Sequence, residues 1–375
     1  MRWIAVMLMT AAASAGPLPH EAYVWQRLWT PDVRSAMHDA AGLFAGYRVL
    51  AAETDRNGHL QSFAVDWTKA DTAVVRIDGT LRRFDAKMLL RELAALKARW
   101  PRRIGLEIDY DCGTASLPAY AAFLKQVRAL KPARLSITAL PAWLDSAALP
   151  ALLAQTDETV LQVHAVQAPS RDLFDVRLAR RWIDGFDRLG KPFRVALPDY
   201  GTRVIRSEGG AVIAMESEAP KLIGGASAEE LTATPEAVAA LLIDLNRRPP
   251  RHLTGIVWFR LPVKGDARIW SLPTLAAVIQ GKPLAAKVGI AVRTGLAAGS
   301  LDLLLTNDGD TDAPSPRAVH LPARCTPADG VGGYRYDAQK NTLIRLQNVL
   351  IRAHHVRVIG WARCNAGQGE FHVEP

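Results

Sequence analysis

Eight short apolar runs recur along the first 261 residues of the chain, and most are bounded by residues that favour turns. Their length and their content of valine, isoleucine, leucine and aromatic residues are typical of strands buried on both faces. The runs are residues 23–28, 47–52, 72–78, 104–109, 134–140, 159–166, 193–198 and 255–261.

Amphipathic segments lie between most of these runs. Asp85 precedes Leu89, Leu93, Leu96 and Trp100, which recur at helical spacing, and its short acidic side chain suits an N-cap. Further helices are expected after the candidate caps Ser116, Asp145 and Thr234, around residues 182–189, and more weakly over residues 32–44.

Alternation of strand and helix requires parallel strands with right-handed crossovers. Eight such strands predict an α/β fold, a (β/α)8 TIM-type barrel spanning residues 16–281. An open doubly wound sheet is the alternative, but no glycine-rich phosphate loop follows an early strand. Two units are irregular: residues 60–67 are expected to be extended, and residues 202–218 to form a hairpin over the barrel mouth.

The pattern changes at residue 282, where short strands alternate with Gly, Asn, Asp and Pro. This predicts a small antiparallel β-sandwich domain over residues 282–375. Cys325 and Cys364 both fall in it, and export from the cytoplasm would allow them to form a disulfide. Cys112 is expected to be a small buried residue.

Residues 1–15 are expected to be a signal peptide, because Arg2 precedes a short apolar run and Ala13-Ser14-Ala15 suits cleavage. The protein is then exported, to the periplasm or the cell exterior. No later run is long enough for stable membrane insertion. The net charge is +9, but the basic residues are dispersed, which favours an anionic cell-surface polymer over nucleic acid as a partner.

The run Gly105-Leu106-Glu107-Ile108-Asp109-Tyr110-Asp111 carries three acidic residues at alternate positions. Side chains alternate along a strand, so Glu107, Asp109 and Asp111 share one face and point into the barrel. Asp111 lies nearest the C-terminal mouth, where barrel enzymes keep their chemistry. Glu107, which lies deeper, is interpreted as the partner of Arg76 in a structural ion pair.

Polar and aromatic residues near the ends of the other strands suggest a sugar site, in which rings pack on pyranose faces and polar groups bind hydroxyls. The expected ligand is a polysaccharide or oligosaccharide. The candidate substrate-binding residues are Trp25, Arg27, Asp78, Trp143, Gln162, His164, Asp199, Tyr200 and Trp258.

Two neighbouring carboxylates repel, so one of them retains a proton near neutral pH. We expect Asp111 to be the general acid and Asp109 the assisting carboxylate of a glycoside hydrolase acting on an extracytoplasmic polysaccharide. An acetamido group of an amino sugar can serve as nucleophile. No cofactor is expected and no metal, because His and Asp lack zinc-site spacing and residues 307–312 fit a polar turn better than a calcium loop.

Two other functions remain open. The barrel can bind a glycan or a cell-envelope polymer without cleaving it, or the sandwich can serve as a scaffold for protein interactions. The crowd of carboxylates in the barrel favours hydrolysis, whereas the short side chain of Asp111 favours binding alone.

The acidic strand resembles that of the chitinase-like family 18 glycoside hydrolases, which reads Asp-Gly-x-Asp-x-Asp-x-Glu. Ile104 replaces the first Asp, Glu107 the second, and Asp111 the catalytic Glu. Trp258 stands where the family has a tryptophan under the sugar, whereas Gln162-Val163-His164 replaces its Met-x-Tyr-Asp. The resemblance implies a TIM barrel and glycan hydrolysis.

The whole chain is more closely similar to an uncharacterised family of exported bacterial proteins that carry a domain of unknown function. Segments that carry this resemblance are residues 23–27, 108–112 and 138–143. It implies a barrel and export, and it names no reaction.

Overall fold

The structure is a computed structural model that describes residues 17–81, 83–165, 173–207, 209–216, 227–266, 268–346, 350–364 and 370–374. The expected signal peptide, residues 1–15, lies outside the described residues.

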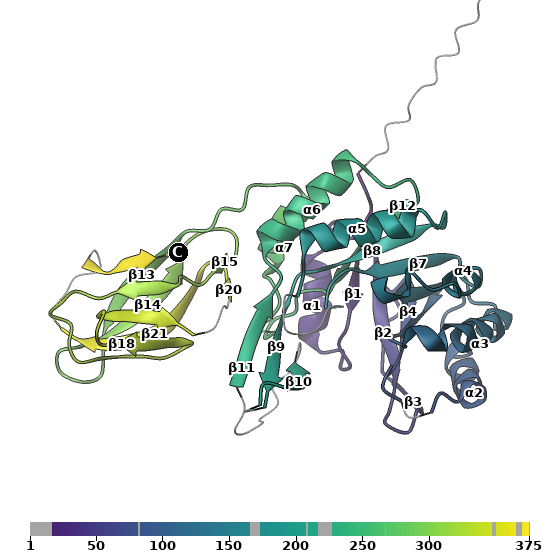
Figure 1. The fold of residues 1–375 in the computed structure, drawn as a ribbon, viewed down its shortest axis with the longest axis horizontal. Helices are drawn as coiled ribbons and strands as arrows, with labels where there is room; N and C mark the ends of the chain where they lie inside the picture. The colour runs from purple at the N-terminus through teal and green to yellow at the C-terminus, as the bar shows by residue number, and fades with distance from the viewer. Residues whose placement is uncertain are drawn as a thin grey trace, which may run out of the picture.

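Eight parallel strands form a closed barrel (Figure 1). They are β1 (His20–Val24), β2 (Gly46–Thr54), β4 (Thr72–Ile77), β5 (Gly105–Tyr110), β6 (Leu135–Ala139), β7 (Glu158–Gln162), β8 (Phe193–Pro198) and β12 (Leu253–Phe259). Their order is β1-β12-β8-β7-β6-β5-β4-β2, and pairing between β1 and β2 closes the ring. The predicted TIM-type fold is confirmed.

Helices cover the outside of the barrel. They are α1 (Pro31–Asp39), α2 (Ala86–Lys97), α3 (Leu117–Ala129), α4 (Leu149–Leu153), α5 (Val176–Asp187), α6 (Pro235–Arg247) and α7 (Leu272–Ile279). The apolar stripe of α2 is buried against the strands, and Asp85 accepts a hydrogen bond from the Met88 N–H at 3.0 Å, as expected of its cap. Thr234 caps α6 in the same way.

Three elements differ from the sequence prediction. Asp145 does not cap α4, because prolines start two separate turns, the 3₁₀ turn Pro141–Trp143 and α4 itself. Strand β1 begins at His20, three residues before the predicted run, since the polar residues His20 and Glu21 hide its start. Helix α7, capped by Ser271, was not predicted.

Both irregular barrel units are extended. Strand β3 (Leu60–Ser62) pairs antiparallel with β2 where a helix would normally follow. After β8 the chain forms a three-stranded antiparallel sheet of β9 (Gly201–Arg206), β10 (Val212–Glu216) and β11 (Ser227–Thr232). The expected hairpin is therefore present as β9 and β10, and a third strand extends it.

The C-terminal region contains two four-stranded antiparallel sheets. The first comprises β13 (Val288–Thr294), β14 (Ser300–Asn307), β21 (His355–Arg363) and β17 (Ala328–Gly330). The second comprises β18 (Tyr334–Asp337), β19 (Thr342–Arg345), β16 (Ala318–His320) and β22 (His372–Glu374). A short pair, β15 (Ala313–Pro314) and β20 (Leu350–Ile351), lies beside them. Ile290, Leu303 and Ile359 of the first sheet share one apolar core with Val319 and Leu343 of the second, as in a sandwich.

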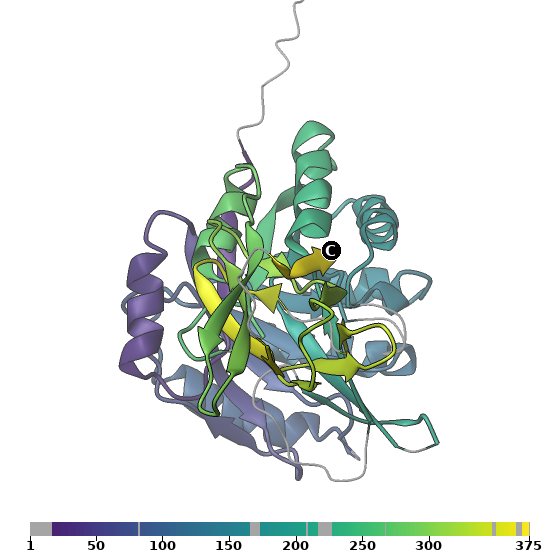
Figure 2. The same cartoon turned by 90° about the vertical axis from the view of Figure 1, so that its left-hand side faces the viewer.

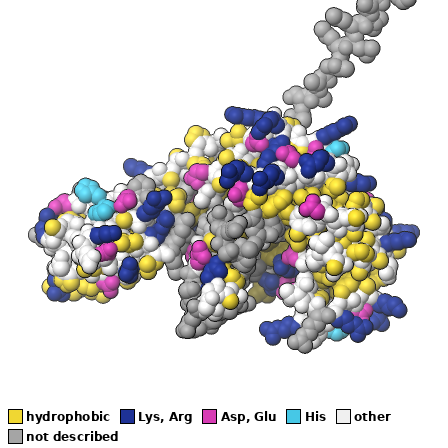
Figure 3. Space-filling model, viewed as in Figure 1, with side chains coloured by type: hydrophobic (Ala, Val, Ile, Leu, Met, Phe, Trp, Pro, Cys, Tyr) yellow, Lys and Arg dark blue, Asp and Glu magenta, His cyan; other side chains and the backbone are white. Residues whose placement is uncertain are grey.

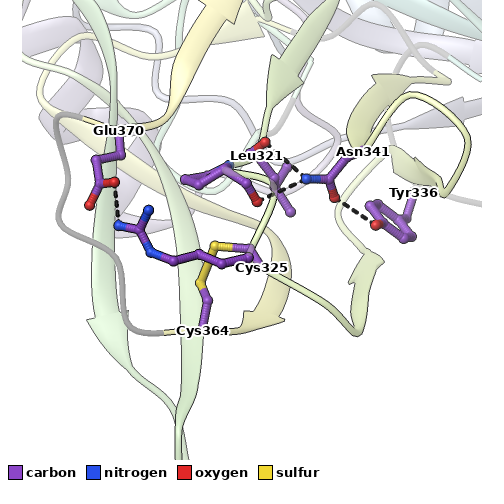
Figure 4. Close-up of a disulfide and its surroundings, with 8 residues drawn as sticks. Leu321, Cys325, Tyr336, Asn341, Cys364 and Glu370 are labelled. Carbon is purple, nitrogen blue, oxygen red and sulfur yellow. Dashed lines mark hydrogen bonds and ion pairs between the residues drawn. A yellow bond between two sulfur atoms is a disulfide. The ribbon is translucent and has the colours of Figure 1, made fainter.

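A disulfide joins Cys325 and Cys364 at one side of this domain (Figure 4). Close by, the Asn341 side chain donates hydrogen bonds to the carbonyls of Leu321 and Pro322, and the Tyr336 hydroxyl donates one to Asn341. The disulfide therefore fixes a segment that is also held by half-buried side-chain hydrogen bonds.

The C-terminal domain lies to one side of the barrel in Figure 1 and in front of it in Figure 2. The Asp312 carboxylate accepts hydrogen bonds from the backbone and the hydroxyl of Ser271, at the start of α7, at 2.7 and 2.8 Å. It also accepts one from the Ala353 N–H of the C-terminal domain at 2.9 Å. Because Asp312 is buried, these bonds connect the two domains through a dry contact.

Candidate active site

The inward side chains of the barrel form layers, and the one at the N-terminal ends of the strands is a closed network of charges. We call Glu21, Arg48, Glu107, Glu158 and Arg194 the lower layer. Arg48 is fully buried and donates to Glu21 at 2.6 Å and to Glu158 at 2.8 Å, and it forms an ion pair with Glu107. Arg194 donates to Glu158 at 2.9 Å. The three carboxylates of the lower layer are thus compensated by Arg48 and Arg194, together with Arg134, whose Nη1 lies 3.8 Å from Glu158.

An apolar layer lies above this network. It is formed by the buried side chains Tyr23, Leu50, Val74, Val160, Ala196 and Val257, with Trp25 at its upper side. The Tyr23 hydroxyl donates downward to Glu107. The apolar layer therefore separates the lower charges from the barrel mouth.

Arg76, Asp109 and Asp111, which we call the upper layer, lie at the C-terminal ends of β4 and β5. Arg76 is the register neighbour of Asp109 on the adjoining strand. Its Nη1 lies 3.8 Å from Asp109 Oδ2, and its Nη2 lies 3.7 Å from Asp111 Oδ2. These separations are ion-pair contacts too long for direct hydrogen bonds. Arg76 therefore attracts both carboxylates without binding either tightly.

A cavity of about 220 Å³ opens above the carboxylates. It is lined by Tyr23, Trp25, Arg76, Asp109, Asp111, Thr138, Gln162, His164, Ala165, Ala196, Tyr200, Thr202 and Phe259. The Oδ1 atom of Asp111 is buried and has no hydrogen-bond partner among the described residues. Such an atom is costly to leave unsatisfied, so it indicates a place for a ligand or solvent donor.

Burial makes both carboxyl groups weak acids. It raises the pKa of Asp109 to about 7, with a further contribution from the charge of Asp111, while Arg76 opposes the rise. Burial also raises the pKa of Asp111, again against the attraction of Arg76. The pair consequently retains a proton close to neutral pH, as general acid catalysis requires.

The opposite wall of the cavity is aromatic and uncharged. The Tyr200 hydroxyl lies 3.3 Å from Nδ1 of His164. Burial lowers the pKa of His164 to about 3, so the imidazole stays neutral at physiological pH. Its Nε2 atom has no hydrogen-bond partner among the described residues. The guanidinium of Arg76 lies over the Trp25 ring, 5.7 Å from its centroid.

Six of the residues predicted from the sequence line this cavity, and five do not. Those that line it are Trp25, Asp109, Asp111, Gln162, His164 and Tyr200. Those that lie elsewhere are Arg27, Asp78, Trp143, Asp199 and Trp258.

The two tryptophans outside the cavity belong to the outer core. Trp258 is fully buried, stacks on His20 and donates a hydrogen bond to it at 2.9 Å. Trp143 is buried beside α3 and donates to the Cys112 carbonyl at 3.0 Å. Neither tryptophan lines the cavity, where the sequence placed both. Strand β12 is apolar on both faces, so alternation along it gave no way to tell Trp258 from the inward Val257 and Phe259.

Two of the three polar residues outside the cavity have other partners, and the carboxyl oxygens of the third, Asp199, have no hydrogen-bond partner among the described residues. Arg27 forms an exposed ion pair with Glu53 at 2.7 Å. Asp78 accepts hydrogen bonds from the N–H and hydroxyl of Thr80, as a turn residue does. Asp199 is fully buried, and burial raises its pKa well above the ordinary range despite the attraction of Arg260.

Arg76 is the cavity residue whose role the sequence misassigned. It was expected to pair with Glu107, but Arg48 takes that place in the lower layer. Register explains the difference, because Arg76 pairs across with Asp109 whereas Glu107 lies beside Val74. Tyr23 and Phe259 also line the cavity, and both were absent from the candidate set.

Within the described part of the chain, no cluster of three or more His, Cys, Asp or Glu side chains is arranged to hold a metal ion. The described helices include none with the length and apolarity needed to span a bilayer.

Comparison with known proteins identifies two families. Residues 68–264 match a family described as domain of unknown function DUF3142, and residues 291–365 match another, domain of unknown function DUF8456. No curated protein matches the chain.

Among solved structures, the chain is similar to a chitinase from Chromobacterium violaceum, with 13% identity and a TM-score of 0.49 over 70% of this chain and 98% of that one. It is similar to the spore cortex-lytic enzyme SleL of Bacillus cereus, with 12% identity and a TM-score of 0.49 over 70% and 74% of the two chains. A chitinase from Flavobacterium johnsoniae gives 11% identity and a TM-score of 0.44 over 71% and 94%. Since the first family match spans more than half of the 375 residues, the chain belongs to the DUF3142 family.

Proposed function

We propose that the barrel is a glycoside hydrolase that cleaves an extracytoplasmic polysaccharide, with Asp111 as general acid and Asp109 as the assisting carboxylate. The observation that carries the proposal is a pair of carboxyl groups with raised pKa values beneath a cavity at the C-terminal mouth of the barrel. Asp111 is the outer of the two, and one of its oxygens has no partner in the described residues.

The paired carboxyl groups suit proton delivery to a glycosidic oxygen. Asp109 is almost completely buried and holds its proton up to about pH 7. Asp111 transfers its proton to the oxygen of the leaving sugar as the bond to the anomeric carbon breaks. The pair has then given up the proton that its two members share, and Arg76, 3.7 Å from Asp111 Oδ2, stabilises the added negative charge.

Both cavity carboxylates come from one strand end, so they approach the sugar from the same side. A retaining mechanism with an enzymic nucleophile needs carboxylates on opposite sides of the bond. The arrangement is better suited to substrate assistance, in which the acetamido oxygen of an amino sugar attacks the anomeric carbon. Water then opens the cyclic intermediate and returns a proton to Asp111.

The other walls of the cavity suit a sugar ring. Trp25, Tyr200 and Phe259 supply apolar ring faces, while Gln162 and the neutral His164 supply hydrogen-bonding groups. This is the mixture of stacking surface and convergent polar atoms that saccharides require.

We also propose that the protein works outside the cytoplasm. The disulfide between Cys325 and Cys364 supports this location, because such bonds persist in oxidising compartments. Lys and Arg side chains lie on both the barrel and the C-terminal domain on the face seen in Figure 3, which suits an anionic cell-surface polymer.

The deciding experiment is a panel of soluble amino-sugar and neutral glycans incubated with the native chain and with Asp111→Asn, with products measured by mass spectrometry. Cleavage should fall by about 10²–10⁴-fold in the variant, because general acid catalysis contributes that much. Asp78→Asn is the matched control, since it makes the same chemical change on the neighbouring strand end outside the cavity, and it should retain cleavage.

Binding without cleavage is the second candidate function. It is favoured by the contact of Arg76 with both carboxylates, which opposes protonation. In that case a glycan binds equally to the native chain and to Asp111→Asn, and neither protein cleaves it. If no glycan on the panel binds or is cleaved, both functions are excluded in favour of a protein-interaction scaffold.

A further inference from the structure

The first sheet of the C-terminal domain carries a row of polar and aromatic side chains on its outer face. Arg293 of β13 lies opposite Asp302 of β14, Asp302 lies opposite Trp361 of β21, and Trp361 lies opposite Asp329 of β17. Residues directly opposite in neighbouring strands share a face of the sheet. Leu303, one residue along from Asp302, is buried in the core, so the row faces away from it.

A hollow of about 550 Å³ lies over this row. It is lined by Arg293, Thr294, Leu296, Ala297, Ser300, Asp302, Trp361 and Arg363. One wall is the turn between β13 and β14, whose Leu296 side chain stands fully in solvent. The site therefore has a floor on the sheet and a wall on the turn.

Trp361 presents its ring to the hollow and is 37% exposed. Trp258 and Trp270 of the barrel, in contrast, are fully buried. An indole exposed beside charged groups offers a flat apolar face of the kind that packs against a sugar ring.

Among the charged side chains that line the hollow, Arg293 and Arg363 outnumber Asp302, and this balance favours an acidic ligand. Asp329 is exposed opposite Trp361 but is not part of this lining. Arg293 and Asp302 neutralise each other through an ion pair of 2.8 Å. Arg363 lies two residues beyond Trp361 on the same strand, so both side chains project from one face. The Arg363 N–H donates to the Pro327 carbonyl, but its side chain is exposed and makes no hydrogen bond or ion pair with another described residue. The hollow therefore carries one uncompensated guanidinium, and a guanidinium binds carboxylates through two parallel hydrogen bonds.

We propose that this hollow binds an acidic sugar unit of a polysaccharide, independently of the barrel cavity. The ring of the sugar packs on Trp361, and its carboxylate binds the fork of Arg363. The paired Arg293 and Asp302 provide a donor and an acceptor for ring hydroxyls. The second site would hold the protein on an acidic polymer whether or not the barrel cleaves it.

Affinity electrophoresis of the full-length chain tests this proposal, with gels containing polygalacturonate, polyglucuronate or alginate at about 150 mM salt. At least one of these polymers should retard the native protein, and the fully methyl-esterified form of that polymer should not. Trp361→Ala and Arg363→Gln should each raise the dissociation constant at least tenfold. Trp361→Tyr retains an aromatic ring and should stay within about threefold of native.

Two controls isolate the site. Arg335→Gln removes the same charge from an exposed position on β18 of the second sheet and should leave binding unchanged. Arg128→Gln removes an exposed charge from the barrel surface outside the cavity and should also leave binding unchanged, which places the site in the C-terminal domain. Thermal unfolding of each variant verifies that it is folded.

Three outcomes would overturn the proposal. The first is that none of the three polymers retards the native chain. The second is that folded Trp361→Ala binds as well as native. The third is that Arg335→Gln weakens binding as much as Arg363→Gln does, which would mean that general charge attraction and no defined site is responsible.

Discussion

Strand β5 contributes acidic side chains to two layers of the barrel that differ in how well their charges are compensated. In the lower layer, Glu107 lies in a network whose hydrogen bonds from Arg48 and Arg194 to Glu21 and Glu158 span 2.6 to 2.9 Å. In the upper layer, Arg76 lies 3.7 and 3.8 Å from the carboxylates, and a cavity opens above them. The same strand thus provides Glu107, which has a structural role, and Asp109 and Asp111, which face a cavity where chemistry can occur.

The difference follows from depth. At the closed end of the barrel, an uncompensated charge would cost several kcal/mol, so the carboxylates there lie in ion pairs with arginines. At the mouth, incomplete compensation is tolerable because solvent or a ligand can supply the remaining contacts. Loose pairing and raised pKa values are therefore the features that distinguish the upper layer as a site for chemistry.

The largest expected effect comes from removing the cation of the lower layer. Arg48→Met leaves buried carboxylates without their shared partner and should reduce the free energy of unfolding by about 3–5 kcal/mol. Arg76→Met, the same change in the upper layer, should cost about 1 kcal/mol or less, because its contacts are long and partly exposed. Urea denaturation of both variants measures the difference, and equal losses would contradict the division into two layers.

The second-largest expected effect is a difference between the two layers in how stability depends on pH. The pKa of Asp109 is about 7 in the folded chain and near 3.8 when unfolded, so the folded state holds the extra proton between these values. The stability of the native protein should therefore fall as pH rises from about 4 to 7, because the Asp109 carboxyl group ionises in the unfolded chain while the buried group keeps its proton. Asp109→Asn should remove this loss and stabilise the protein by roughly 2–4 kcal/mol at pH 8, with little change at pH 4.

The matched control for Asp109→Asn is Glu107→Gln in the lower layer. It removes the ion pair with Arg48 and should destabilise the protein at both pH values. Denaturant midpoints at pH 4 and pH 8 distinguish the two variants. If Asp109→Asn also destabilises the chain at pH 8, the upper layer is as structural as the lower one.

A smaller effect is expected on the titration of the carboxyl pair itself. Arg76 lowers the pKa values of Asp109 and Asp111, so Arg76→Gln should raise both, by about one unit for a cation at this distance. Carboxyl carbon resonances followed by NMR against pH measure the shift directly. If cleavage is detected, the alkaline limb of its pH profile should move upward equally. Unchanged titration would mean that Arg76 is too distant or too solvated to tune the pair.

The sequence predicted the barrel well because its evidence is distributed over many residues. Eight apolar runs of strand length, separated by amphipathic segments, leave few topologies available. The position of Asp109 and Asp111 followed from alternation along β5 and the rule that barrel sites lie at strand ends. These inferences depend only on the periodicity of side chains within single segments, and the folded structure has that periodicity.

Other site residues depended on information that a single segment does not hold. The partner of Glu107 is decided by register among neighbouring strands, and Arg48 lies 59 positions away from it. The inward face of β12 is undecidable from alternation because both faces are apolar. A position just after a strand end was also not enough to place a residue in the cavity. Asp78 accepts a hydrogen bond from Thr80 instead, and Trp143 packs outside the sheet.

The two tryptophans that the sequence could not tell apart provide the smallest predicted effect. Trp25 lines the cavity, whereas Trp258 packs on His20 in the outer core. Trp25→Phe keeps a ring but reduces the stacking surface, and should weaken saccharide binding about threefold, a loss of about 0.7 kcal/mol. Trp258→Phe should leave binding unchanged and lower the melting temperature, because it loses the hydrogen bond to His20. Titration calorimetry and thermal unfolding separate the two effects, and equal binding losses would place the sugar ring away from the wall that Trp25 forms.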